Sequence, residues 1–155
     1  MRKLSYVLLV LALMLPLAIP FAPALAQESA TVVAALETYN ANLPAGYGNV
    51  SVADLSVEMI EKPNLVLLDV RQPEEYAEAH IPGAFNIPLR ELAQGLDKLP
   101  DLDAEIVVYC GSAFRSSMAM TSLQILGYTN VRNMAGGFAA WQGEGQRVEA
   151  TRGRA

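Results

Sequence analysis

The chain has 155 residues, of which 52% are hydrophobic, and its 11 basic and 16 acidic side chains give a formal net charge of −5. This acidic balance argues against nonspecific binding to nucleic acid or to anionic membrane surfaces. The hydrophobic fraction is inflated by the N-terminal segment, so it does not indicate a membrane protein. Residues 27–155 suit one compact domain with an ordinary core.

Residues 1–26 have the layout of a secretory signal peptide. Arg2 and Lys3 precede an apolar run over residues 4–26, which contains three prolines and ends in the small-residue sequence Ala-Leu-Ala. We therefore expect an exported protein, periplasmic or extracellular. Cleavage removes two of the 11 basic side chains, which leaves 9 against 16 acidic ones and a net charge of −7. The alternative is a membrane anchor over residues 4–26, because that run is long enough to span a bilayer.

Residues 27–49 are predicted to form an N-terminal helix and a linker. The helical composition lies over residues 30–41, and the sequence NLPAGYGN then breaks the pattern with proline and glycine. Ser51 is expected to cap a helix that runs to about Ile60, with Asp54 three residues on as in a capping box. The rest of the chain is predicted to form two parts, a domain over residues 50–145 and a C-terminal tail over residues 146–155.

Two continuous apolar runs, residues 65–70 and 105–110, are typical of parallel strands covered on both faces. Strands and helices alternate with short connections, which predicts an α/β fold with an open, mostly parallel sheet flanked by helices on both faces. Ligand sites in such sheets lie beyond the carboxyl ends of the strands. The other expected elements are short strands within 80–88 and 130–134, and helices over 72–79 with Pro73 in the first turn, 89–99 weakened by Gly95, 115–126 ended by Gly127, and 136–142.

Cys110 is the only cysteine of the chain, and it ends the predicted strand over residues 105–110. A single cysteine cannot form an internal disulfide. In an exported protein, such a thiol is buried and inert, paired with another molecule, or reactive. Its position at the carboxyl end of a strand is the position of a ligand site.

The loop after Cys110 has the composition of an anion-binding turn. Gly111 permits unusual backbone angles, the N–H groups of such a loop point inward, and the following helix presents its positive end. Arg115 can bond loop carbonyls or hold an anion, and Ser112 and Ser116 add hydroxyl donors. These groups should lower the pKa of the thiol, and they would also stabilise a persulfide anion. The alternative is a buried structural cysteine with an arginine that caps nearby carbonyls.

Three motifs resemble those of the rhodanese-like domain family. LLDVRQPEEYAEAHIPGAFNIP is similar to the first hallmark of that family, VVYCGSAFRSS to its active-site loop, and NMAGGFAAWQ to its final glycine–tryptophan motif. The motifs follow one another in the family's order and spacing. The resemblance implies a five-stranded parallel sheet between helices and transfer of sulfane sulfur through a cysteine persulfide, without a metal or an organic cofactor.

The same resemblance assigns roles to individual residues. Cys110 takes the position of the nucleophile, and a loop with four residues before Arg115 has the sulfurtransferase length, whereas phosphatases of related fold have one residue more. Phosphoryl chemistry is therefore disfavoured. The implied partners are a small sulfur-containing donor, such as thiosulfate, a polysulfide or a persulfide, and a thiol or protein acceptor. The implied substrate-binding residues are Gly111, Ser112, Ala113, Phe114 and Arg115.

Asp69, Arg71 and Ser116 are expected to support the site. Asp69 ends the strand over residues 65–70 at the same edge of the sheet, where it could contact the loop or pair with an arginine. Arg71 is close in sequence to two glutamates, which favours an ion pair with them. The expected packing or structural residues are His80, Met118, Met120, Phe138 and Trp141, together with Gly136 and Gly137, which serve close packing or a helix start.

Two features of the loop depart from the family pattern. Ala113 stands where glycine is usual, and the loop carries no basic side chain before Arg115. Phe114 would present an apolar surface at the mouth. These features favour a second hypothesis, in which the chain is a noncatalytic rhodanese-like module that binds a partner or senses reactive sulfur through Cys110.

Overall fold

The computed structural model describes residues 21–151. The chain divides into two compact units between Glu37 and Thr38, inside the first described helix. The described elements, with η for 3-10 helices, are α2 (Phe21–Ala41), η2 (Ala45–Gly48), β1 (Asn49–Val50), α3 (Val52–Glu61), β2 (Val66–Asp69), α4 (Pro73–Glu78), β3 (Phe85–Asn86), η3 (Leu89–Gln94), η4 (Leu96–Lys98), β4 (Ile106–Tyr109), α5 (Phe114–Ile125), β5 (Val131–Met134) and α6 (Gly137–Gly143).

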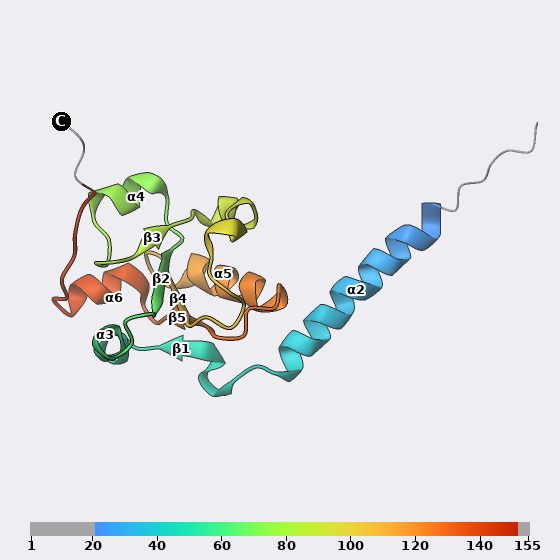
Figure 1. Cartoon of the computed structure of the whole chain (residues 1–155), viewed down its shortest axis with the longest axis horizontal. Helices are drawn as coiled ribbons and strands as arrows, with labels where there is room; N and C mark the ends of the chain where they lie inside the picture. Colours follow the sequence, from blue (N-terminus) through green and yellow to red (C-terminus); the bar gives the residue numbers. More distant parts are fainter. Residues whose placement is uncertain (1–20, 152–155) are drawn as a thin grey trace, which may run out of the picture. The chain divides into compact units, whose positions relative to one another are not determined.

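The strands in this part of the chain form one five-stranded sheet in the order β1-β5-β4-β2-β3, and every neighbouring pair is parallel (Figure 1). In the centre, β2 and β4 pair from Val66 opposite Ile106 to Asp69 opposite Tyr109. Both strands read as continuous apolar runs because helices cover both of their faces. The prediction of an open parallel α/β sheet is confirmed.

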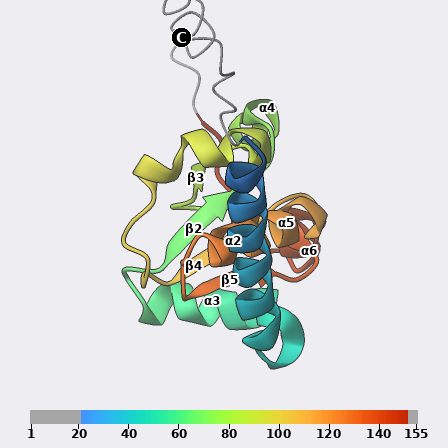
Figure 2. The ribbon, with the colours of Figure 1, turned by 90° about the vertical axis from the view of Figure 1, so that its right-hand side faces the viewer.

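Helices lie on both faces of the sheet (Figures 1 and 2), and each face has its own hydrophobic core. α5 and the η3 and η4 segments pack on one face, and α3 and α6 pack on the other. Side chains alternate along β4, so Val108 and Cys110 belong to the α5 side, whereas Val107 and Tyr109 belong to the α3 and α6 side. The side chain of Cys110 therefore lies on the face of the sheet that α5, the next helix, covers.

Most predicted helix ends are confirmed. The Ser51 hydroxyl accepts the Asp54 N–H at 3.0 Å at the start of α3, and Gly127 follows α5 with a φ of 101°. The prediction of one helix over residues 89–99 is wrong, because Gly95 separates two 3-10 segments. A Cβ at Gly95 would lie 2.9 Å from Ile87 Cγ2, so the chain packs too closely there for an ordinary helix residue.

The N-terminal prediction lies partly outside the described residues, since residues 1–20 of the expected signal peptide are not among them. The helix expected over residues 30–41 is present, and α2 extends it back to Phe21, across the expected cleavage point. Within residues 21–151, no helix is long and apolar enough to cross a membrane.

Residues 146–151, which the sequence predicts as a tail, pair with the domain. The His80 N–H donates to the Glu149 carbonyl at 2.7 Å, and the Glu149 N–H donates to the His80 carbonyl at 2.9 Å. The imidazole of His80 is buried and stacks on the ring of Tyr76, with 3.9 Å between centroids. Trp141 Nε1 donates to the Arg147 carbonyl at 2.8 Å. His80 thus has the structural position that was expected of it.

Candidate active site

Cys110 follows the last residue of β4 and is 1% exposed. The chain then turns through three residues into α5, and the turn closes at Ala113, whose φ of 74° and ψ of −8° are left-handed. Gly111 is the residue of the loop that permits unusual backbone angles, but the positive φ is at Ala113 instead. A Cβ at Gly111 would lie 3.3 Å from Arg115 Nη2, so a larger residue there would require a small shift of that guanidinium.

The groups of the loop converge on the sulfur of Cys110. Burial raises the pKa of the Cys110 thiol, but hydrogen bonds from the Ser116 hydroxyl and from the backbone N–H groups of Ser112, Ser116 and Arg115 lower it by more. The pKa therefore lies below its ordinary value. Such donors would favour any anionic sulfur held at this position.

The N-terminus of α6 donates two backbone hydrogen bonds to the loop after Cys110. The Phe138 N–H donates to the Cys110 carbonyl at 2.6 Å, and the Ala139 N–H donates to the Gly111 carbonyl at 3.0 Å. This approach needs a glycine at 137, where φ is 62° and a Cβ would lie 2.5 Å from the Cys110 carbonyl oxygen. Because the loop carbonyls are bound on the α6 side, the N–H groups of the loop remain for the sulfur.

Arg115 reaches across the loop to α4. Its Nη1 donates to Glu75 Oε2 at 2.7 Å and its Nη2 donates to Glu75 Oε1 at 2.8 Å, a two-pronged pair with both side chains half-buried. Hydrogen bonding from Arg115, with a smaller contribution from the Gln72 N–H, outweighs burial and lowers the Glu75 pKa from 4.5 to about 2. The pair in turn raises the Arg115 pKa. The sequence does not identify Glu75 as part of the site.

Comparison with known proteins assigns the family. The model of the rhodanese-like domain matches residues 51–144. This chain belongs to the rhodanese-like domain family. A sulfurtransferase from Allochromatium vinosum is 33% identical over 99 residues, which cover 64% of this chain and 92% of the relative. The thiosulfate sulfurtransferase PspE of Escherichia coli is 40% identical over 70 residues, which cover 44% of this chain and 67% of the relative.

A solved structure agrees with the assignment. The crystal structure of a rhodanese-related protein from Thermoplasma volcanium superposes with a TM-score of 0.60 at 32% identity, and the match covers 66% of this chain and 98% of that one. The chain is therefore similar to rhodanese-like proteins in sequence and in fold. The curated relatives named above are sulfurtransferases by name.

Asp69 and Arg71 form a buried pair at the end of β2 in the rhodanese-like domain. Arg71 Nε and Nη2 donate to Asp69 Oδ2 at 2.9 and 2.7 Å, and Nη2 also donates to the Ala79 carbonyl at 2.6 Å. Burial opposes the charge of Arg71, but the pairing with Asp69 raises its pKa. The expected pairing of Arg71 with the nearby glutamates is wrong. The guanidinium carbon lies 4.0 Å from the ring centroid of Phe138, so the pair supports the start of α6.

Ser116 lies in the first turn of α5 with no exposed surface. Its hydroxyl oxygen is 3.5 Å from Cys110 Sγ and 2.6 Å from Asn133 Oδ1. The structure therefore brings the expected hydroxyl to the sulfur. It also adds Asn133 of β5, which the sequence does not identify, because a polar residue inside a short strand carries no signal of what it faces.

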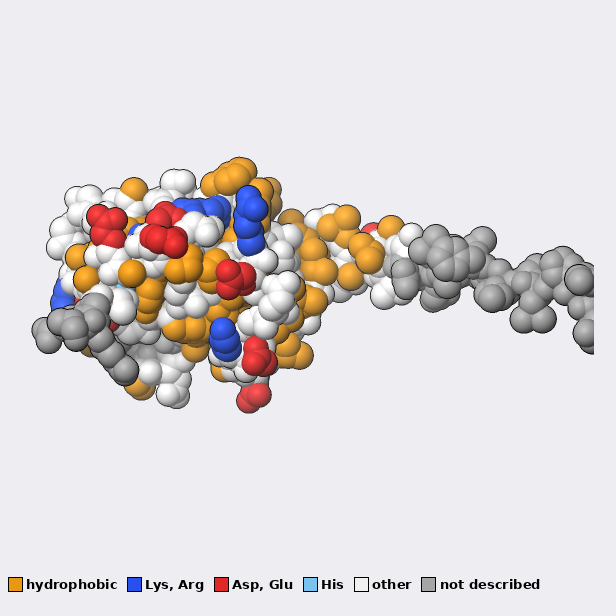
Figure 3. All heavy atoms as spheres, turned by 90° about the horizontal axis from the view of Figure 1, so that it is seen from above, with side chains coloured by type: hydrophobic (Ala, Val, Ile, Leu, Met, Phe, Trp, Pro, Cys, Tyr) orange, Lys and Arg blue, Asp and Glu red, His pale blue; other side chains and the backbone are white. Residues whose placement is uncertain are grey.

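The mouth of the loop carries apolar side chains. Phe114 is 69% exposed, in keeping with the apolar surface expected there. Met118, one turn further along α5, is 47% exposed, so its assignment to the core is wrong, whereas Met120 is buried as predicted. The face seen in Figure 3 has acidic, basic and apolar side chains side by side, without a large patch of one charge.

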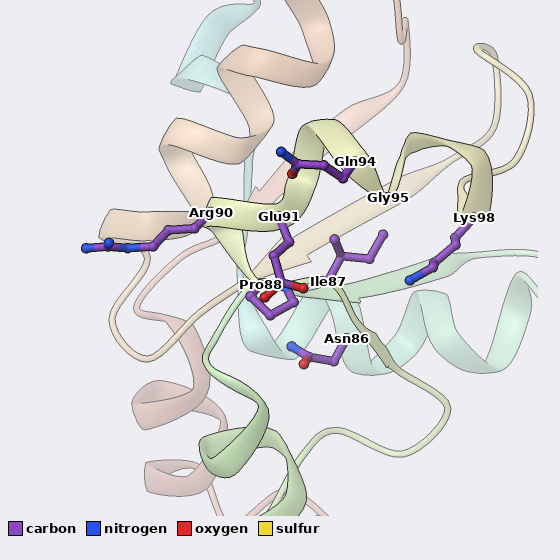
Figure 4. Close-up of a pocket in the computed structure, with 8 residues that line it drawn as sticks. All are labelled: Asn86, Ile87, Pro88, Arg90, Glu91, Gln94, Gly95 and Lys98. Carbon is purple, nitrogen blue, oxygen red and sulfur yellow. The ribbon is translucent and has the colours of Figure 1, made fainter.

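A pocket of about 220 Å³ lies at the edge of the sheet and does not include Cys110. In Figure 4 the side chain of Arg90 points away from this pocket, whereas that of Lys98 points toward it. No three His, Cys, Asp or Glu side chains within residues 21–151 are grouped so that they could hold a metal ion. The residues that line the pocket are Asn86, Ile87, Pro88, Arg90, Glu91, Gln94, Gly95 and Lys98.

Proposed function

We propose that this protein is a sulfurtransferase that carries sulfane sulfur as a persulfide of Cys110. The observation that carries the proposal is the convergence of one hydroxyl and several backbone N–H groups on a single buried thiol whose pKa they lower. The names of the relatives from Allochromatium vinosum and Escherichia coli support the same reaction class. No metal or organic cofactor is needed, because the cysteine itself carries the sulfur.

The proposed reaction has two half-reactions. In the first, the Cys110 thiolate attacks the outer sulfur of the donor, the sulfur–sulfur bond of the donor breaks, and the remainder leaves with the electron pair, as sulfite when the donor is thiosulfate. In the second, a nucleophilic acceptor attacks the outer sulfur of the persulfide, and Cys110 leaves as a thiolate. The backbone N–H groups of Ser112, Arg115 and Ser116 stabilise the negative charge in both half-reactions.

We place polysulfides and persulfides ahead of thiosulfate as donors. Arg115 is the loop's one cation, and both of its terminal nitrogens are engaged by Glu75. Thiosulfate has three oxygens that a guanidinium can hold, so it must compete with the Glu75 carboxylate for Arg115, whereas a polysulfide has no such oxygens. Glu75→Gln should raise the rate with thiosulfate relative to that with polysulfide, whereas Glu74→Gln on the same helix should leave the ratio unchanged. An unchanged ratio in Glu75→Gln would remove this preference.

Steady-state transfer to cyanide tests the proposal. Thiocyanate should form with polysulfide or thiosulfate as donor, with the parallel double-reciprocal lines of a two-step exchange, and Cys110→Ser should abolish it. Activity that survives in Cys110→Ser would place the chemistry elsewhere. A folded protein with reduced Cys110 that transfers no sulfur from either donor would favour the noncatalytic module, which binds a partner or senses reactive sulfur.

We further propose that the protein is exported and that its acceptor is a thiol or protein of that compartment. The basic start, apolar run and Ala-Leu-Ala end of residues 1–26 support export. The mass of the protein recovered from producing cells should correspond to a chain that begins at Gln27. A full-length chain in the membrane fraction would favour the anchor over residues 4–26, and a full-length chain in the cytosol would contradict export.

A further inference from the structure

A hydrogen-bonded row of polar side chains leads from the sulfur of Cys110 into the sheet. Ser116 Oγ lies between Cys110 Sγ, at 3.5 Å, and Asn133 Oδ1, at 2.6 Å. On the other side, Asn133 Nδ2 donates to Asn49 Oδ1 at 2.9 Å. Asn49 of β1 and Asn133 of β5 are partners in the sheet, so the sheet register sets the position of this hydrogen-bonded row. Ser116 and Asn133 are both buried.

The Ser116 hydroxyl has one proton and two possible acceptors. Asn133 Oδ1 is an amide oxygen that can only accept, and it is the closer of the two. When the sulfur is neutral, the Ser116 hydroxyl therefore donates its hydrogen bond to Asn133 Oδ1. A lone pair of the Ser116 oxygen then remains to accept a hydrogen bond from the Cys110 S–H. When the sulfur becomes a thiolate it is the stronger acceptor, because hydrogen bonds to charged groups are about twice as strong as neutral ones.

We propose that Asn133 is a positioning residue, whose Oδ1 accepts the hydrogen bond of the Ser116 hydroxyl while Cys110 Sγ is uncharged and loses that hydrogen bond to Sγ when Sγ carries charge. Sγ is charged twice in the proposed cycle, before it attacks the donor and when it leaves the persulfide, and it is uncharged in between. The Ser116 hydroxyl turns accordingly. This inference deepens the proposed function, but its test uses only the reactivity of the thiol.

The charged groups around the sulfur are not part of the hydrogen-bonded row formed by Ser116, Asn133 and Asn49. Arg115 of α5 interacts with Cys110 and is paired with Glu75 of α4, and α6 has no charged side chain. Substitutions at Ser116 or Asn133 leave all these groups in place, so a change in thiol reactivity reports on the hydroxyl. The ionic groups of the neighbouring strands pair with one another or with α3, namely Asp69 with Arg71 and Arg132 with Glu58.

The rate of alkylation of Cys110 by iodoacetamide, followed against pH, tests the proposal. Asn133→Leu replaces the competing acceptor with an apolar side chain of similar size, so the Ser116 hydroxyl donates its hydrogen bond to the sulfur instead. Below the pKa of the thiol, the fraction of Cys110 in the thiolate form should rise about tenfold, which corresponds to about 1.4 kcal/mol of thiolate stabilisation. Alkylation should become about threefold faster, because a more stable thiolate is a weaker nucleophile. Ser116→Ala should make it slower. In the Ser116→Ala background, Asn133→Leu should have no further effect, because no hydroxyl is left to redirect.

A purely structural role of Asn133 predicts the opposite sign. Slower or unchanged alkylation in folded Asn133→Leu would overturn the proposal, and so would a gain of the same size when Asn133→Leu is added in the Ser116→Ala background. If Asn133→Leu does not fold, Asn133→Ala, which leaves space instead of filling it, carries the same prediction. Because alkylation needs no sulfur donor, these outcomes are independent of whether the protein transfers sulfur.

Discussion

Gly137→Ala tests whether α6 holds the active-site loop in place. A Cβ at this position would lie 2.5 Å from the Cys110 carbonyl oxygen and 2.7 Å from the backbone nitrogens of Ser112 and Ala113, so α6 or the loop must move. The left-handed backbone costs alanine about 1–2 kcal/mol. Loss of the two hydrogen bonds from α6 costs about 1 kcal/mol each, and the stiffer unfolded chain returns about 0.4–1 kcal/mol. The expected loss of stability is about 2–3.6 kcal/mol.

Urea unfolding followed by the fluorescence of Trp141, the chain's one tryptophan, measures this loss. Gly143→Ala is the matched control, because Gly143 ends the same helix, has no positive φ and would place its Cβ in open space. That control should be neutral or more stable by up to about 1 kcal/mol. Alkylation of Cys110 should also slow in Gly137→Ala. A loss below about 0.5 kcal/mol would refute the close approach of α6 as the constraint on the loop.

Three further substitutions have defined expectations. Ala113→Gly should raise the free energy of unfolding by up to about 1 kcal/mol, because glycine adopts the φ of 74° without strain; a loss in urea unfolding would contradict this. The Arg132 hydrogen bond lowers the Glu58 pKa from 4.5 to about 2 against the effect of burial, so the wild type should exceed Glu58→Gln by about 1 kcal/mol at neutral pH. That advantage is present above pH 4.5 and disappears as the pH falls toward 2, and thermal melts that keep it constant would refute the pairing. Asp69→Asn leaves Arg71 buried without its anion and should cost about 3–5 kcal/mol in urea unfolding, where a cost below about 1 kcal/mol would mean that the pair contributes little.

The sheet could be predicted because its central strands are coded locally. β2 and β4 are covered on both faces, so they read as uninterrupted apolar runs whatever their neighbours are. The prediction of one helix over residues 89–99 failed, because the local sequence shows a helical pattern but does not show the close approach of Gly95 to Ile87. Gly95 stands between the two 3-10 segments, and a Cβ at this position would lie 2.9 Å from Ile87 Cγ2.

The site divides in the same way. Cys110, the loop and Ser116 are neighbours in sequence, so the convergence of their donors could be expected from strand–loop–helix geometry alone. Glu75 is 40 residues from Arg115, and only the fold brings α4 to the loop. Arg71 has two glutamates near it in sequence, yet it pairs with Asp69 because both are buried at the end of β2. Burial, which sequence proximity does not encode, selects the partner.

The most direct test of the central claim is the intact mass of the purified protein after exposure to polysulfide and, separately, to thiosulfate. The mass should rise by one sulfur atom with at least one donor, return to its starting value on addition of cyanide, and stay constant in Cys110→Ala. A gain that persists in Cys110→Ala, or no gain with either donor on folded protein with a reduced thiol, would contradict a persulfide carried by Cys110.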